Sequence, residues 1–328
     1  MFSLRTLAFR STSPLSTLRS RTARFLSTSD SLLGQLQVPV EQAIDLHPNK
    51  DVVFLDGTWW MPNSKEITAR QAFQHGPRIA GAHFLDIDDI ATPSNGLPHM
   101  MPSASLWSSY MNTCGIRNDQ HVIVYGQSSD CPFTHRALVT FHAMGHDKER
   151  IHLLQGSLED WIQAGGPVDT EPITVPRAAD LESAPGDYKA TEPQAIMDRK
   201  QLMRICESRD SAYRILDARA PNRFAGTVDE PRPGLRLGHM PGAENVFFMD
   251  LLQPDAPVRL LPVPELRAAL GDLVDTPQTV ISSCGSGVTA CVLKVALMAC
   301  GRDPDSILIY DGSWVEWGSY DDTPIVKE

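Results

Sequence analysis

Short apolar runs rich in β-branched residues recur along the chain and alternate with segments of helical periodicity. Four of the clearest are VVFLD at 52–56, HVIVY at 121–125, YRILD at 213–217 and TVISS at 279–283. Apolar runs of this length are typical of buried strands, and their alternation with helices is typical of a mainly parallel sheet. The pattern therefore predicts an α/β fold in which the sheets are flanked by helices.

The same succession of motifs occurs twice, which indicates an internal duplication. Asp56 and Asp217 each end a predicted strand and lie 161 residues apart. Near the end of each half, a Gly-Ser-x-x-x-Trp motif follows an apolar run, beginning at Gly156 and at Gly312. Because a duplicated unit of this length is the size of a domain, we expect two tandem domains.

The predicted domains cover residues 30–168 and 190–328. Between them, the stretch 165–193 is rich in prolines, glycines and acidic residues and shows no periodicity, and residues 169–189 form its central part. A segment of this composition is typical of a connection between domains, so we expect a linker that lies along the surface.

Residues 1–29 do not share the pattern of the domains. They contain five arginines, many serines and threonines, and no acidic residue. They also lack the apolar core of a secretory signal, and this composition is typical of a mitochondrial transit peptide. We expect cleavage between Arg24 and Ser29 and a mitochondrial protein. The alternatives are a disordered tail without a targeting role and an additional cytoplasmic pool.

Charge and cysteine spacing exclude several kinds of partner and cofactor. The net charge is −11 and no basic face is visible, so neither nucleic acid nor an anionic membrane surface is an expected partner. No uncharged apolar stretch reaches the roughly 18 residues that a membrane span needs. The six cysteines form no C-x-x-C motif and no metal-ligand spacing with histidines. We therefore predict no metal, no other cofactor and no structural disulfide.

The stretch around residues 280–300 carries the clearest chemical signal. An apolar strand ends at the glycine-rich loop Cys284-Gly285-Ser286-Gly287, and an apolar segment of helical period follows from Val288 to Cys300. A strand, glycine loop and helix start direct backbone N–H groups and the helix dipole at one point, where they stabilise an anion. A cysteine thiolate placed there would be a stabilised nucleophile. The alternative is that Cys284 is a small buried apolar residue.

Two further features of this stretch narrow the prediction. A cysteine phosphatase needs an arginine six residues after the nucleophile, and position 290 is Ala290. The corresponding loop of the first half, from Tyr125 to Ala137, is longer and lacks the compact glycine pattern. The first domain is therefore predicted to be catalytically inactive, and Cys131 within its loop is predicted to be non-catalytic.

Three motifs of the second half resemble those of the tandem-rhodanese family, and specifically its 3-mercaptopyruvate sulfurtransferases. They are CGSGVTAC at 284–291, the RF…DEPRPG…GHMPGA pattern within 223–243, and YDGSWVEWG at 310–318. The resemblance covers about 38–320. It implies that Cys284 takes sulfur from 3-mercaptopyruvate, releases pyruvate, and passes the sulfur from a persulfide to cyanide or to a thiol acceptor such as thioredoxin.

The resemblance also implies roles for residues outside the cysteine. Arg223 and Arg232 are expected to bind the carboxylate and carbonyl of the substrate. Ser286 is expected to form a proton relay with Asp88 and His99, which would place first-domain residues in the site of the second domain. The remaining loop residues are expected to contact the substrate: Gly285, Gly287, Val288 and Thr289.

The chain departs from the family pattern at two positions, and two other activities remain as alternatives. Asn222 stands where the family has a glycine before Arg-Phe, and Met101 stands where it has a leucine. Thiosulfate sulfurtransferases of the same family typically carry a basic pair where this chain has Gly285-Ser286, which disfavours thiosulfate as the donor. The second alternative is a persulfide carrier for tRNA thiolation.

Overall fold

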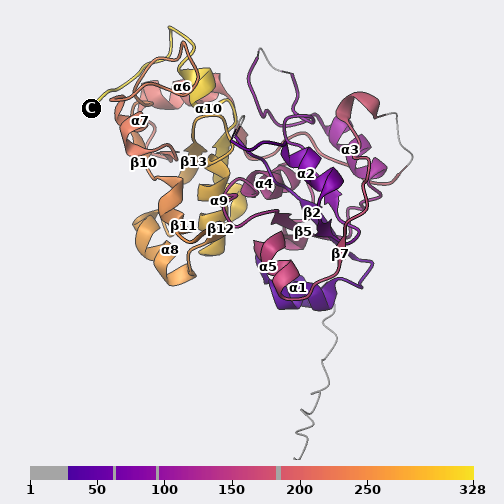
Figure 1. Cartoon of the computed structure of the whole chain (residues 1–328). Coiled ribbons are helices and arrows are strands. Elements are labelled where there is room, and N and C mark those ends of the chain that lie inside the picture. The colour runs from indigo at the N-terminus through magenta and orange to yellow at the C-terminus, as the bar shows by residue number, and fades with distance from the viewer. Residues whose placement is uncertain (1–28, 62–63, 94–95, 182–185) are drawn as a thin grey trace, which may run out of the picture.

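The computed structural model describes residues 29–328 except 62–63, 94–95 and 182–185. Apart from Ser29, the predicted transit peptide therefore lies outside the described residues, and so does most of its predicted cleavage region. The described chain forms two lobes that lie side by side (Figure 1), the first coloured indigo to magenta and the second orange to yellow.

Each lobe contains one five-stranded parallel sheet, which confirms the predicted α/β fold. The first sheet has the strand order β1-β6-β5-β2-β4 and the second the order β10-β9-β13-β14-β8. The strands of the first sheet are β1 (Gln37–Pro39), β2 (Val52–Asp56), β4 (His83–Phe84), β5 (His121–Gly126) and β6 (Ile151–Ser157). Those of the second are β8 (Ile196–Met197), β9 (Tyr213–Asp217), β10 (Ala243–Asn245), β13 (Thr279–Ser283) and β14 (Ile307–Tyr310).

Short helices flank both sheets, and two small antiparallel pairs complete the fold. The pairs are β3 (Arg78–Ile79) with β7 (Val168–Asp169), and β11 (Leu252–Gln253) with β12 (Ala256–Leu260). The helices are α1 (Val40–Leu46), α2 (Ala69–His75), α3 (Ala104–Thr113), α4 (His135–Ala143), α5 (Leu158–Gln163), α6 (Arg199–Ser208), α7 (Pro221–Ala225), α8 (Val263–Leu270), α9 (Ala290–Ala299) and α10 (Ser313–Trp317). Within the described residues, no helix has the length and apolar character that crossing a bilayer requires.

The two lobes share their largest hydrophobic core. Helices α4 and α9 lie between the sheets (Figure 1), and residues such as Phe141 and Leu293 belong to one buried cluster. All residues of α4 are buried, as are residues 290–297 of α9. Since burial of apolar area is the main stabilising contribution in proteins, this interface holds the two domains together firmly.

The described part of the predicted linker lies against the first domain. The Ile173 N–H donates to the Gln74 carbonyl over 3.0 Å. Further along, the Tyr188 side chain is buried, and its hydroxyl accepts a hydrogen bond from Trp107 over 3.3 Å. Because these contacts are all with one domain, the segment adds to that domain before the chain enters the second sheet at β8.

Candidate active site

Cys284 directly follows β13, at the carboxyl edge of the second sheet. Helix α9 begins at Ala290, two residues later than the predicted start at Val288, so the loop spans residues 284–289. Residues 288 and 289 instead form the tighter i→i+3 hydrogen bonds, in which the Cys291 N–H donates to the Val288 carbonyl and the Val292 N–H to the Thr289 carbonyl, each over 3.1 Å. Within the loop, Gly287 has a φ of 81°, in the left-handed region that other residues rarely adopt. A Cβ atom at this position would lie 2.7 Å from the Asp311 carbonyl oxygen, so the close approach also requires glycine.

The cysteine is fixed on both sides by hydrogen bonds. Its Sγ accepts the Gly287 N–H over 3.1 Å, and its own N–H donates to Ser313 Oγ over 3.1 Å. The start of α10 also binds the loop, because the Trp314 N–H donates to the Cys284 carbonyl over 3.0 Å. Among the described residues, Gly287 supplies the one backbone N–H that reaches the sulfur, so the loop stabilises it less extensively than a full ring of amides would.

A cavity of about 380 Å³ opens at the cysteine and is lined by both domains. From the first domain, Trp59, Met61 and Phe133 form one wall. The expected substrate-binding residues of the second domain line the other side of the cavity, except Gly287, which is not a lining residue. The expected residues that line the cavity are Cys284, Gly285, Ser286, Val288, Thr289, Arg223 and Arg232.

The two expected arginines differ in their partners. Arg223 lies on α7, and its Nη2 forms an ion pair of 2.5 Å with Glu230. That same nitrogen is 3.0 Å from where a Cβ at Gly285 would lie, so the guanidinium lies against the cysteine loop. Arg232 is half-buried and, within the part of the chain that the structure describes, forms no hydrogen bond or ion pair. It is therefore free to bind an anion that enters the cavity.

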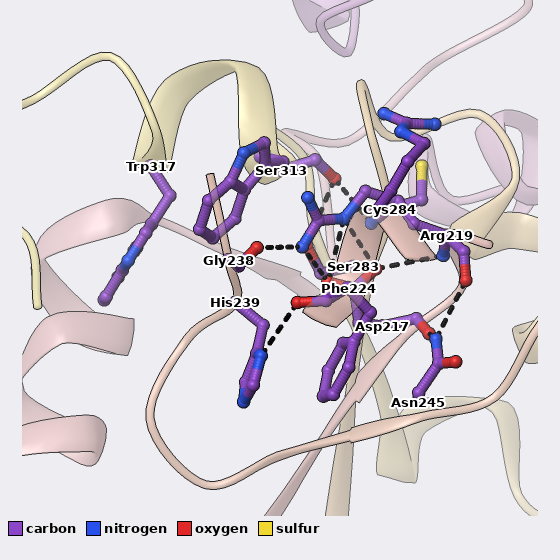
Figure 2. Close-up of polar contacts among 12 residues, drawn as sticks. Asp217, Arg219, Phe224, Gly238, His239, Asn245, Ser283, Cys284, Ser313 and Trp317 are labelled. Atoms are coloured by element: carbon purple, nitrogen blue, oxygen red, sulfur yellow. Dashed lines mark hydrogen bonds and ion pairs between the residues drawn. The ribbon is translucent and has the colours of Figure 1, made fainter. Parts of the chain in front are cut away.

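A third arginine of the cavity, Arg219, was not predicted from the sequence. It pairs with Asp217 at 2.6 Å and with Glu230 at 2.8 Å, and its guanidinium stacks on Trp314. Figure 2 shows Arg219 and its partner Asp217 beside Cys284. A sequence signal did exist, because the second half reads Asp217-Ala-Arg219 where the first reads Asp56-Gly-Thr58.

These contacts set the charge of the cavity. Three guanidinium groups, those of Arg219, Arg223 and Arg232, line it, and the carboxylates of Asp217 and Glu230 are bound to them. Arg219 and Arg223 are thus paired with these carboxylates, whereas Arg232 forms no ion pair among the described residues. Its guanidinium can bind a carboxylate of a substrate.

Two of the three expected relay residues are brought together. His99 Nδ1 is hydrogen-bonded to the Asp88 carboxylate, which also accepts the Trp59 indole N–H over 2.8 Å. Burial opposes the charge of Asp88, but the hydrogen bonds from His99 and Trp59 and the charges of His99 and Arg232 outweigh it and lower the Asp88 pKa. Ser286 is not joined to the pair, and His99 Nε2 is buried without a partner among the described residues.

The other cysteines near the site are poor nucleophiles. Burial raises the pKa of Cys291 to about 12, and it also raises the pKa of Cys131 to about 12. A thiol with such a pKa is almost fully protonated at neutral pH and reacts slowly. The non-catalytic role of Cys131 stays a prediction, and the raised pKa is an argument for it.

Comparison with known proteins gives the family. The rhodanese-like domain model matches residues 66–164 and 198–320. The human 3-mercaptopyruvate sulfurtransferase is 33% identical over 267 residues, covering 80% of this chain and 84% of that protein. The thiosulfate sulfurtransferase of Cricetulus griseus is also 33% identical, with the same coverage.

A solved structure gives the same result. The sub-stoichiometric sulfur transferase subunit of yeast mitochondrial complex I, solved by cryo-EM, is 29% identical with a TM-score of 0.75, covering 89% of this chain and 99% of that chain. Two parallel sheets, two family matches and relatives at this identity agree with one another. The chain therefore belongs to the rhodanese-like sulfurtransferase family and consists of two rhodanese-like domains in tandem.

Proposed function

We propose that this sulfurtransferase takes sulfur from 3-mercaptopyruvate, holds it as a persulfide on Cys284 and releases pyruvate. The observation that carries the proposal is the free guanidinium of Arg232 in the same cavity as the Cys284 sulfur. A guanidinium binds a planar carboxylate with two hydrogen bonds, and 3-mercaptopyruvate carries one carboxylate.

The reaction is written in two half-reactions. The Cys284 thiolate attacks the sulfur of the bound 3-mercaptopyruvate, an S–S bond forms, and the C–S bond breaks with its electron pair going to carbon. The donor leaves as the enolate of pyruvate, which takes up the proton that the donor thiol lost. In the second half-reaction an acceptor thiolate attacks the outer sulfur, and the Cys284 thiolate is regenerated, as in covalent catalysis with two substrates.

We assign roles to the remaining residues of the site. The Gly287 N–H stabilises the negative sulfur, because it already binds Cys284 Sγ. Arg223, Arg232 and the loop residues Gly285, Val288 and Thr289 orient the donor. The Asp88–His99 pair moves the proton to the enolate, since the unpartnered His99 Nε2 can donate or accept, and Ser286 extends this path to the donor.

Thiosulfate is the second candidate donor. A relative named thiosulfate sulfurtransferase is as similar to this chain as the human 3-mercaptopyruvate sulfurtransferase, so identity does not separate them. The uncharged loop residues Gly285 and Ser286 favour 3-mercaptopyruvate, because thiosulfate is a dianion that needs more positive charge around the sulfur. A carrier of persulfide for tRNA thiolation, acting without its own donor, would not need Arg232.

Paired initial rates test the proposal. The full-length protein is assayed with 3-mercaptopyruvate and with thiosulfate, and cyanide is the common acceptor. We expect kcat/KM to be at least about tenfold higher with 3-mercaptopyruvate, and Arg232→Ala to raise its KM roughly 10- to 100-fold with little change in kcat. A higher kcat/KM with thiosulfate would overturn the choice of donor, and turnover of neither would favour the carrier.

We also propose that the protein acts in mitochondria and passes its sulfur to a thiol such as that of thioredoxin. The similarity to a mitochondrial sulfur transferase subunit and the composition of residues 1–29 support the location. A fluorescent fusion of the whole chain should enter mitochondria, whereas one lacking residues 1–29 should not. Retention of the mitochondrial signal after this deletion would contradict the predicted transit peptide.

A further inference from the structure

One buried arginine of the first domain reaches across to the cysteine loop of the second. Arg136 lies on α4 and is 1% exposed. Its Nη1 donates to the Gly287 carbonyl over 3.0 Å and to Asp311 Oδ1 over 2.7 Å. Its Nη2 donates to the His99 carbonyl. The Arg136 guanidinium thus contacts three parts of the site: the cysteine loop, the Asp311 carboxylate and the loop that carries His99.

Asp311 closes this arrangement from the second domain. Its Oδ1 pairs with Arg136, and its Oδ2 accepts the Met101 N–H over 2.7 Å. The carboxylate is 3% exposed, so the hydrogen bond by which it holds the segment of His99 and Met101 is buried. Hydrogen bonds to charged groups are stronger than neutral ones, so this buried pair fixes the geometry around it.

Both of the segments held by Arg136 have backbone conformations that need support. His99 has a φ of 58°, which is uncommon for a residue other than glycine. Gly287 has a φ of 81°, and its N–H is the donor to Cys284 Sγ. Because Arg136 binds the carbonyls of both residues, it fixes at once the direction of the sulfur-binding N–H and the place of the histidine.

We propose that Arg136, paired with Asp311, is a positioning residue of the sulfur-transfer site that aligns the Gly287 N–H and His99 around Cys284. This inference rests on the proposed function, because it assigns Arg136 a part in the sulfur transfer. The proposal also gives the first domain, which is predicted to be inactive, a role in the site. The guanidinium comes from α4, the helix at the end of the long first-domain loop. Arg136 does not line the cavity and does not contact the substrate.

The test compares Arg136 with a matched buried arginine. Arg302 is 8% exposed and donates to the carbonyls of Leu273, Thr276 and Gln278, just before β13. Cys284 follows the other end of β13, so Arg302→Met removes a similar set of buried bonds far from the sulfur. The full-length variants Arg136→Met and Arg302→Met are compared by melting temperature, by kcat and KM, and by the alkylation rate of Cys284 with iodoacetamide, followed by peptide mass spectrometry.

We expect both variants to melt at lower temperature but only Arg136→Met to lose activity. Its kcat should fall about 100-fold with a donor KM within about threefold of the original, because misplacement by about 1 Å can cost that much in rate. Arg136→Lys should recover part of the kcat, because the lysine ammonium group can form one of the hydrogen bonds that the guanidinium forms. A kcat within threefold in Arg136→Met, an equal loss in Arg302→Met, or a change confined to KM would each overturn the proposal.

Two further measurements keep the outcome decisive. If Arg136→Met does not fold, Asp311→Asn replaces it, because the amide oxygen can still accept the Met101 N–H. A kcat unchanged in Asp311→Asn then overturns the proposal, and a fall with unchanged KM supports it. The alkylation rate needs no sulfur donor, and we expect it to fall at least about tenfold in Arg136→Met. If the wild-type protein turned over neither donor, the proposed function would fail while the alkylation rate would still decide the role of Arg136.

Discussion

At the carboxyl edge of the first sheet Asp56 lies opposite Tyr125, and at the same place in the second sheet Asp217 lies opposite Ser283. The residue after Tyr125 is Gly126, and the residue after Ser283 is Cys284. The same strand ends therefore carry a thiol in one domain and no side chain in the other. A cysteine at position 126 would also meet Thr134, because a Cβ atom there would lie 2.8 Å from its methyl carbon.

The buried carboxylates differ in the same way. Asp217 is bound by Arg219, whereas Asp56 is bound by the Thr58 N–H and the Gln127 amide and, within the described part of the chain, forms no ion pair. At these positions the first domain has neither the thiol nor the arginine of the second, but the two sheets have the same parallel arrangement. The first domain contributes Trp59, His99 and Arg136 around the Cys284 loop. The predicted nucleophile therefore lies in one domain and part of its surroundings in the other.

The largest expected effect comes from removing the nucleophile. Cys284→Ser should lower turnover with either donor by at least about 10³-fold, because a hydroxyl does not form the persulfide. Cys131→Ser, in the corresponding loop of the first domain, should retain activity within about twofold. Both are measured as initial rates of sulfur transfer to cyanide. If Cys131→Ser lost as much activity as Cys284→Ser, the two loops would not be divided into active and inactive.

The same substitution should have opposite effects at the two buried carboxylates. Asp217→Asn leaves Arg219 with a weakened partner and should cost about 3–5 kcal/mol of unfolding free energy. Burial raises the pKa of Asp56 to about 6, so its ionised form destabilises the fold at neutral pH. Asp56→Asn should therefore stabilise the protein by up to roughly 3 kcal/mol at pH 7.5.

The pH dependence of the stability is the control for the Asp56→Asn and Asp217→Asn comparison. Asp56 has a pKa of 3.8 in the unfolded chain and of about 6 in the folded protein. Its ionisation therefore lowers the free energy of unfolding as the pH rises between these two values. The gain from Asp56→Asn should accordingly shrink by about half at pH 5. Urea unfolding at both pH values, followed by tryptophan fluorescence, measures the difference. Destabilisation by both substitutions at pH 7.5 would mean that the two sites do not differ in charge balance.

The smallest expected effect concerns acid sensitivity, which should be concentrated in the first domain. Burial lowers the pKa of His135, His142 and His152 to about 4, and all three lie in that domain. Below pH 6.5 the unfolded chain binds protons that the folded chain does not, so stability falls as pH drops from 6.5 to 4. The raised pKa of Asp56 has the opposite effect on stability in this pH range, but it is a single group, whereas three histidines have a lowered pKa.

A single histidine variant measures this contribution. His142→Gln removes one of the three groups and should lower the midpoint of acid unfolding by about 0.3 pH unit. Hydrogen exchange at pH 5 should show faster opening of α4 and β6 than of β9 and β13. Faster exchange in the second domain would contradict the assignment.

Much of the fold could be predicted because its signals are local. A buried strand needs a short apolar run, and a tight turn before a helix needs glycine, so both β13 and the loop at Gly287 are visible in the order of residues. The duplication is visible for the same reason, since Asp56 and Asp217 end equivalent strands. The start of α9 was predicted two residues early, because apolar periodicity does not show that residues 288 and 289 form the tighter i→i+3 hydrogen bonds.

By itself, the sequence determined the two α/β units and the glycine-rich loop of Cys284, which is the predicted nucleophile. Only the tertiary structure decided which distant side chains surround Cys284. Arg136 is 151 residues away from Gly287 along the chain, and it bonds to the Gly287 carbonyl because α4 packs beside α9. Nothing in the neighbourhood of either residue encodes that contact. Secondary structure follows from a few neighbouring residues, whereas this site depends on how two buried faces pack, which is a property of the whole chain.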